Sequence, residues 1–132
     1  MTQLISLNLK DGNLSSYIPS TLGSLIQLTL LDLSVNYLIG TIPSSMGTLM
    51  RLNYQNMFSN ELFGTIPTTL GNLVTGSIPS TLGNLVQLNH LHLVSNQLAG
   101  TIPSTLEDLV QLTYLGLSDN MLTGTIPSTW EI

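Results

Sequence analysis

The chain of 132 residues contains no cysteine and very few cations. Without cysteine, neither a disulfide framework nor a thiolate metal site can form, and cysteine usage leaves the compartment undetermined. Lys10 and Arg51 are the only cations and stand against seven carboxylates, which gives a net charge of −5. A surface so poor in cations cannot follow a phosphate backbone, so we expect no nucleic-acid partner and no binding to anionic lipid.

Long apolar runs are absent as well, although 42% of the residues are hydrophobic. No run approaches the roughly 18–20 residues that span a bilayer, so we expect no membrane insertion by this chain. The start, MTQLISLNLK, lacks a basic segment followed by an apolar block, so no secretory signal is predicted. With so few charges, the exposed surface must consist largely of Ser, Thr and Asn, which supply 42 of the 132 residues.

The sequence does contain a repeat, because IPSTLGNLVQL or a close variant returns every 24 residues. A period of this length indicates stacked supersecondary units that share one core. We therefore predict a single domain over residues 1–132. Its third coil is longer because residues 73–84 duplicate half a repeat without its strand. The alternative is a break between two blocks, 1–72 and 85–132. The predicted coils are 1–24, 25–48, 49–84, 85–108 and 109–132.

Each coil combines a strand, a turn and a short helical turn. Alternation of leucine with polar residues, as in Leu91-His92-Leu93, predicts a strand with one buried face. The asparagine three residues later, such as Asn96, can bond the backbone of a neighbouring coil. A glycine follows where backbones pass closely, and an Ile-Pro pair then opens a short turn of 3₁₀ type.

This pattern resembles the plant-type leucine-rich repeat, LxxLxxLxLxxNxLxGxIPxxLGxL, over the whole chain, as found in ectodomains of receptor-like proteins and receptor kinases. The resemblance implies an α/β-type repeat solenoid. Its parts would be a right-handed superhelix with a concave parallel β-sheet, a short second sheet at GxIP and a 3₁₀ or irregular convex side. It also implies an extracellular or cell-surface location. Family members commonly carry cysteine-bearing caps, which are missing here, so we expect end-to-end self-association. Gln55 stands where a buried leucine belongs and, without partners, would cost about 1–3 kcal/mol.

Aromatic and acidic side chains are predicted to share the outward face of the concave strands. Clustered, exposed aromatics with a polar tip are typical of recognition surfaces, although aromatics are also good strand formers. We predict a non-catalytic module that binds a protein, peptide or carbohydrate there, and its carboxylates favour a basic partner. An inhibitor of cell-wall-degrading enzymes would use the same face. The predicted partner-binding residues are Asp32, Tyr37, Tyr54, Phe58, Glu61, His90, His92, Tyr114 and Asp119.

Two chemical alternatives on this face are weaker. His90 and His92 leave the same side of one strand, with Asp119 on the next coil, but two imidazoles and a distant carboxylate are poor evidence for a metal. A catalytic set of Ser95, His92 and Asp119 lacks visible oxyanion donors and a strained nucleophile turn. We therefore predict no enzyme, no metal and no cofactor.

A row of hydroxyl-bearing residues on another face suggests a different function. A flat, uncharged row of this kind resembles an ice-binding surface, and some plant leucine-rich repeat proteins act as antifreezes. Serine and threonine at these positions are also ordinary caps of short turns. Ice binding is therefore the alternative prediction. It would use Thr41, Thr65, Ser77, Thr101 and Thr125.

Overall fold

The computed structural model describes residues 4–70 and 87–130, which form two parallel five-stranded sheets and a column of short 3₁₀ helices. The main sheet contains β1 (Ser6–Asn8), β3 (Leu30–Asp32), β5 (Tyr54–Asn56), β7 (His90–His92) and β9 (Tyr114–Gly116). The second sheet contains β2 (Ser15–Tyr17), β4 (Tyr37–Gly40), β6 (Glu61–Gly64), β8 (Gln97–Thr101) and β10 (Met121–Thr123). The 3₁₀ helices are η1 (Ser20–Ser24), η2 (Ser44–Thr48), η3 (Thr68–Leu70), η4 (Ser104–Asp108) and η5 (Ser128–Trp130).

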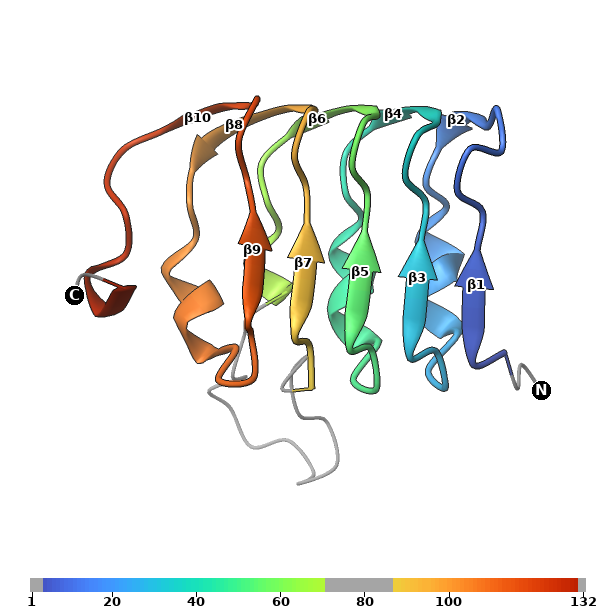
Figure 1. Ribbon diagram of the computed structural model, residues 1–132, viewed down its shortest axis with the longest axis horizontal. Coiled ribbons are helices and arrows are strands. Elements are labelled where there is room, and N and C mark those ends of the chain that lie inside the picture. Colours follow the sequence, from blue (N-terminus) through green and yellow to red (C-terminus); the bar gives the residue numbers. More distant parts are fainter. Residues whose placement is uncertain (1–3, 71–86, 131–132) are drawn as a thin grey trace.

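The chain winds as a right-handed superhelix, which confirms the predicted solenoid. In Figure 1 it rises through each main-sheet strand, crosses the top into the second sheet, descends behind through a 3₁₀ helix and advances from right to left. Second-sheet strands β4 and β6 end at their glycine, and the Ile-Pro pair follows. Within the described ranges there is no α-helix, and no helix is long and apolar enough to cross a bilayer.

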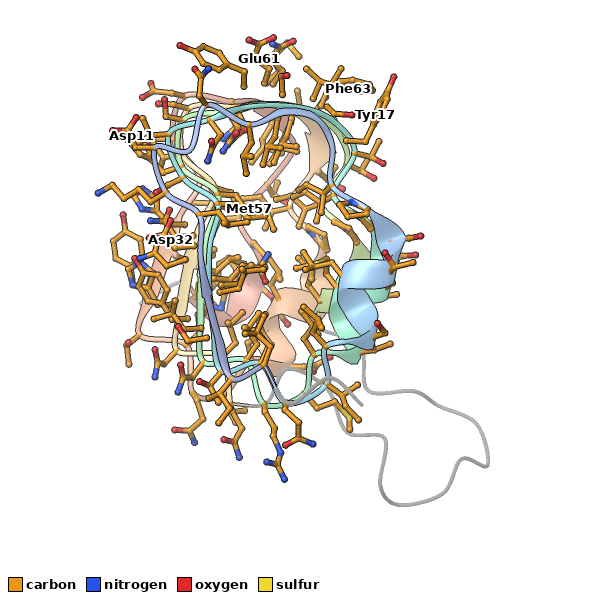
Figure 2. All side chains as sticks on the ribbon, turned by 90° about the vertical axis from the view of Figure 1, so that its right-hand side faces the viewer. Asp11, Tyr17, Asp32, Met57, Glu61 and Phe63 are labelled. Atoms are coloured by element: carbon orange, nitrogen blue, oxygen red, sulfur yellow. The ribbon has the colours of Figure 1, made fainter. Side chains whose placement is uncertain are left out.

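One apolar core runs through the middle of the coils. The central residues of β3 and β7, Leu31 and Leu91, are fully buried, as are Leu28 and Leu88 just before these strands. Because side chains alternate along a strand, each three-residue strand sends its middle residue inward and its two outer residues to the surface. Figure 2 looks along the solenoid and shows Met57 inside and Asp32 on the face of the main sheet.

The asparagine column links neighbouring coils through hydrogen bonds. Asn60 Nδ2 donates to the carbonyl oxygens of Leu33 and Met57 at 3.0 and 3.2 Å, and its Oδ1 accepts from the Leu38 amide at 3.1 Å. Asn36 donates to the same Leu33 oxygen at 2.9 Å, so this carbonyl accepts hydrogen bonds from the asparagines of two coils. The predicted role of this column is therefore confirmed. Asn96 and Asn120 repeat the arrangement.

The main sheet continues across the longest coil. Strand β5 pairs directly with β7, so that Tyr54 lies opposite His90, 36 residues further along the chain. The residues on both sides of this coil therefore share one sheet and one core. The duplicated half-repeat predicted at 73–84 lies outside the described residues, and the coil boundaries remain an interpretation of the repeat.

Gln55 interrupts the buried leucine column of the main sheet. It pairs with Leu31 on one side and Leu91 on the other, and its side chain is fully buried. Its Nε2 donates only a long bond of 3.8 Å to Met57 Sδ, and its Oε1 has no partner among the described residues. The structure therefore confirms the expected burial of an amide that is poorly satisfied.

Candidate functional site

Aromatic rings on three neighbouring strands of the main sheet lie face to face. The ring centroids of Tyr54 and His90 are 4.5 Å apart with 12° between the planes, and those of His90 and Tyr114 are 4.4 Å apart with 9°. The sheet register places the three residues directly opposite one another. Because cross-strand neighbours on one face lie about 5 Å apart, flat side chains at matching positions stack.

A second stack lies beside the first. The Phe58 and His92 rings are 5.1 Å apart at 23°, and His92 turns its edge to Tyr114 at 5.3 Å and 76°. We call these five residues, Tyr54, Phe58, His90, His92 and Tyr114, the aromatic cluster. All five belong to the predicted binding set, and the structure brings them together. Tyr114 is 41% exposed, and the other four rings are half-buried.

Two residues that the sequence analysis missed support the aromatic cluster. A Cβ at Gly116 would lie 2.8 Å from His92 Cδ2 and 2.9 Å from the Tyr114 hydroxyl, so only glycine leaves room for both rings. Asn56 Nδ2 donates to the Tyr54 hydroxyl at 3.3 Å. The signal for Gly116 was its position on a strand, where glycine is unfavourable unless another group approaches closely.

The surroundings of the two imidazoles in the aromatic cluster favour their neutral form. Burial lowers the pKa of His90, and the nearby His92 lowers it further, while Asp32 acts in the opposite direction. Burial likewise lowers the pKa of His92, again against the influence of Asp32. A lowered pKa shifts both rings toward the uncharged form at neutral pH. The cluster therefore presents aromatic surface with little positive charge.

Asp32 lies next to the aromatic cluster but is nearly covered. Its side chain is 7% exposed. Its Oδ1 accepts hydrogen bonds from the Ser34 amide at 2.9 Å and the Ser34 hydroxyl at 2.6 Å, and its Oδ2 accepts from Asn56 Nδ2 at 3.4 Å. The sequence analysis placed this carboxylate on the exposed face. Its neighbours cover most of it there, so only a small part of the carboxylate remains open on this face.

The predicted placement of Tyr37 and Glu61 on the main-sheet face is wrong. Tyr37 begins β4 and Glu61 begins β6, so both belong to the second sheet, and Figure 2 shows Glu61 at the top of the coil, away from Asp32. The chain leaves the main sheet earlier than expected because Val35 and Ser59 adopt left-handed backbone conformations, with φ of 56° and 54°. Asn, Asp or Gly would have indicated such turns, whereas valine rarely adopts this conformation.

The remaining predicted acid, Asp119, lies at a turn after β9. It is exposed and accepts a hydrogen bond from the Ser95 hydroxyl at 3.4 Å. His92 faces Phe58 and Tyr114 instead, so the three side chains do not line up as a nucleophile, base and acid. Among the described residues, no three histidine or acidic side chains are grouped to hold a metal ion.

The threonine row lies where the second-sheet strands end, since Thr41 and Thr65 directly follow β4 and β6 and Thr101 is the last residue of β8. Thr41, Thr65, Thr101 and Thr125 are exposed. A Cβ placed on Gly100 would lie 3.2 Å from Thr65 Cγ2. Because Gly100 directly precedes Thr101, Thr65 and Thr101 are neighbours in the row. Ser77, the fifth predicted member, falls outside the described residues.

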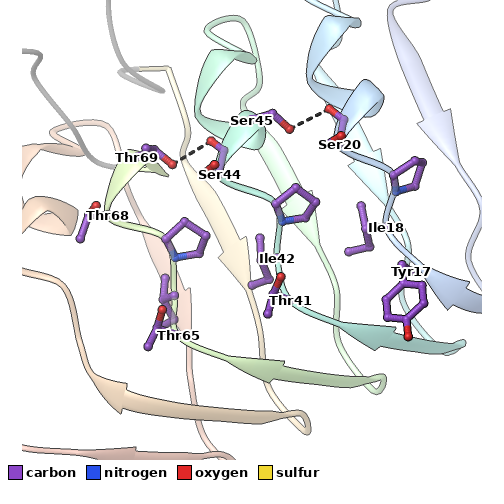
Figure 3. Close-up of a pocket in the computed structure, with 14 residues that line it drawn as sticks. Tyr17, Ile18, Ser20, Thr41, Ile42, Ser44, Ser45, Thr65, Thr68 and Thr69 are labelled. Carbon is purple, nitrogen blue, oxygen red and sulfur yellow. Dashed lines mark hydrogen bonds between the residues drawn. The ribbon is translucent and has the colours of Figure 1, made fainter.

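A groove of about 840 Å³ runs beside this row (Figure 3). Thr41 and Thr65 line one side, residues of the 3₁₀ helices line the other, and Tyr17 stands at one end. The hydroxyls of Ser45 and Thr69 donate to the backbone of the preceding coil at 2.7 and 2.8 Å. These hydroxyls therefore join adjacent coils, whereas η1 and η2 have no side-chain cap of the kind expected from the sequence.

Stacked coils around a shared leucine core, joined by an asparagine ladder, define a solenoid repeat protein. The Leucine Rich Repeat family model matches residues 27–49, 87–109 and 111–131, about half of the sequence. The chain belongs to the leucine-rich repeat family. A search of curated protein sequences returns no match.

Solved plant structures share this fold. The BIR3–SERK2 complex from Arabidopsis thaliana contains a chain 38% identical, with a TM-score of 0.83 over 97% of this chain and 62% of that one. A second match is the structure of the Arabidopsis receptor kinase HAESA with the peptide hormone IDA and the co-receptor SERK1. It is 36% identical, with a TM-score of 0.83 over 98% of this chain and 20% of that one. A plant ice-binding protein is 28% identical, with a TM-score of 0.71 over 90% of this chain and 34% of that one. The chain thus spans less than two thirds of each of these proteins.

Proposed function

We propose that this chain is a non-catalytic recognition module that binds a protein or peptide through the aromatic cluster. The observation that carries the proposal is the continuous stack of Tyr54, His90 and Tyr114 across three adjacent strands. Similar plant proteins support it, since the HAESA structure contains a peptide hormone and a co-receptor. These similar structures also support an extracellular location as part of the proposal.

The geometry of the aromatic cluster suits a binding surface. Stacking fixes each ring between its neighbours, so little side-chain freedom remains to be lost when a ligand arrives. Tyrosines present a large apolar face and a polar hydroxyl, a combination enriched at the energetic centres of interfaces. Strands β5 and β7 below the rings each pair on both sides, and β9 pairs with β7, which fixes the spacing of the rings. The cluster is therefore organised before binding.

A random dodecapeptide library displayed on phage tests the proposal. We expect selected peptides to bind the wild type and to lose at least about tenfold in affinity for a Tyr54→Ala/Tyr114→Ala double variant, because central aromatics dominate interface energies. The matched control is Tyr37→Ala, which removes a tyrosine that is 58% exposed on the second sheet. Peptides that bind the double variant as tightly as the wild type, or a selection without enrichment, would refute the proposal.

Ice binding is the second candidate function and rests on the threonine row. The row of Thr41, Thr65, Thr101 and Thr125 is exposed and uncharged, and one similar structure is a plant ice-binding protein. Thermal hysteresis and ice recrystallisation assays on the wild type and a Thr65→Lys/Thr101→Lys variant test it. The Tyr54→Ala/Tyr114→Ala variant serves as the control and should retain any ice activity. An inactive wild type would end this candidate.

Two narrower parts of the proposal concern other partners. A carbohydrate could occupy the same aromatic surface, since sugar rings also pack on tyrosine faces.

Self-association would join coils end to end: Leu112 and Leu115 are half-buried beside β9, whose outer edge has no neighbouring strand among the described residues. Sedimentation velocity over a hundredfold range of concentration tests self-association, and a constant monomer would exclude it.

A further inference from the structure

A carboxylate without a counter-charge borders the aromatic cluster. Asp32 is 7% exposed, and the three hydrogen bonds that the described residues donate to it come from uncharged groups of Ser34 and Asn56. Burying an ionised carboxylate is costly unless a cation lies nearby. Neither cation of the chain is among these donors. Arg51 donates to Gln27 at 2.6 Å, and Lys10, two residues after the Asn8 that pairs with Asp32, is exposed in the turn after β1.

The carboxylate and the ring stack are joined by one side chain. Asn56 Nδ2 contacts both Asp32 Oδ2, at 3.4 Å, and the Tyr54 hydroxyl, at 3.3 Å. Because both contacts share one nitrogen, the Tyr54 hydroxyl lies less than about 7 Å from Asp32 Oδ2. The bond to Oδ2 is long, so this oxygen retains accepting capacity for a stronger donor.

We propose that Asp32 and the aromatic cluster form a subsite for an arginine side chain of a peptide ligand. This inference rests on the proposed function of the cluster. A guanidinium is planar, stacks on aromatic faces and is more weakly hydrated than an ammonium, so it can satisfy the rings and the carboxylate together. His90 and His92 add little positive charge at neutral pH that would repel it.

The remaining charges of the molecule favour the same ligand. The net charge is −5, and Asp119 lies exposed at the turn after β9. A negative surface attracts cationic ligands and repels acidic ones. An acidic peptide would meet the Asp32 charge at the centre of the contact. A neutral peptide would contact the rings, and its affinity would not depend on the charge of Asp32. The test below separates these outcomes.

Three dodecapeptide libraries, each with arginine, glutamate or glutamine fixed at the central position, are selected against the wild type. We expect the arginine library to give the highest enrichment. For the selected arginine peptides, Asp32→Asn should weaken binding at least about tenfold, since it removes the charge and keeps an oxygen to accept from Ser34. Asp108→Asn is the matched control, because it removes the same charge from η4, outside the main sheet that carries the rings, and it should change affinity less than about twofold.

A change on the peptide provides a second measurement that needs no protein variant. Replacing the arginine of a selected peptide by citrulline keeps its shape and removes its charge, and we expect a loss of affinity of about tenfold or more. Equal enrichment of all three libraries, with binding still dependent on Tyr54 and Tyr114, would overturn the arginine subsite and leave the recognition function standing. Selection of no peptide at all would overturn both.

Discussion

The interior of the solenoid and the outer face of its main sheet follow the same 24-residue repeat, but residue types recur in the interior and vary on the face. Inside, the same residue types return in coil after coil: leucines such as Leu31 and Leu91 and asparagines such as Asn36 and Asn96. On the face, matching positions differ, so that Asp32, Asn56, His92 and Gly116 follow one another on neighbouring strands. Uniform columns hold the coils together, and the varied columns provide the chemistry.

The comparison teaches that a departure from the repeat has opposite consequences in the two regions. In the interior, Gln55 replaces a leucine and leaves an oxygen without a partner in the part of the chain that the structure describes. On the face, Gly116 stands where the neighbouring strands carry Asn56 and His92, and it makes room for two rings. Predictions about each region therefore differ in size and in the property that changes.

The largest expected effect comes from breaking the asparagine column at its centre. Asn60→Ala leaves the buried Leu38 amide without an acceptor and removes bonds to three carbonyls, although Leu33 O keeps its bond from Asn36. We expect a loss of about 3 kcal/mol in the free energy of unfolding. Urea denaturation measures it. Asn120→Ala, in a half-buried position nearer the end of the stack, is the control and should cost less; equal losses would contradict this account.

The next effect is a gain in stability at Gln55. Replacing Gln55 by leucine restores the column and removes a buried amide whose oxygen has no partner within residues 4–70 and 87–130. We expect the free energy of unfolding to rise by about 1–2 kcal/mol. The reverse exchange, Leu91→Gln on the paired strand, should lower it. If Gln55→Leu gives no gain, the amide must be satisfied in solution by a group such as water.

A smaller effect is expected at the aromatic cluster. Tyr114→Ala removes one stacked and one edge contact, but its ring is 41% exposed. We expect a stability loss of about 1 kcal/mol, within the range of a single aromatic pair plus a partly buried ring. Tyr37→Ala, which removes a more exposed ring, should cost less. A loss at Tyr114 as large as that at Asn60 would show that the stack holds the fold together.

The smallest effect is the dependence of stability on pH. His90 and His92 have a lowered pKa in the folded state, so the unfolded chain binds protons first as the pH falls. Their contribution is fully present above the ordinary pKa of about 6.5. It is lost as the pH falls from there through the folded pKa. A His90→Gln/His92→Gln variant should therefore lose less stability between pH 7 and pH 5 than the wild type in thermal denaturation. Identical slopes would contradict the burial of these rings.

The fold and the aromatic cluster could be predicted from the sequence because both follow columns of the repeat. Leu31 and Leu91 identify strands by alternation, and the same frame aligns Tyr54, His90 and Tyr114 across coils. The frame alone could not show that a valine, Val35, takes a left-handed conformation and sends Tyr37 into the second sheet. The burial of Asp32 was also hidden, since it depends on contacts with Ser34 and Asn56 rather than on any column.

The pairing of β5 with β7 means that strand order, and not distance along the chain, decides which side chains are neighbours. Tyr54 lies beside His90 although 36 residues separate them in the chain, and removing the coil that carries β7 would set Tyr54 against Tyr114. The outer face of the main sheet is therefore altered most strongly by adding, deleting or exchanging whole coils.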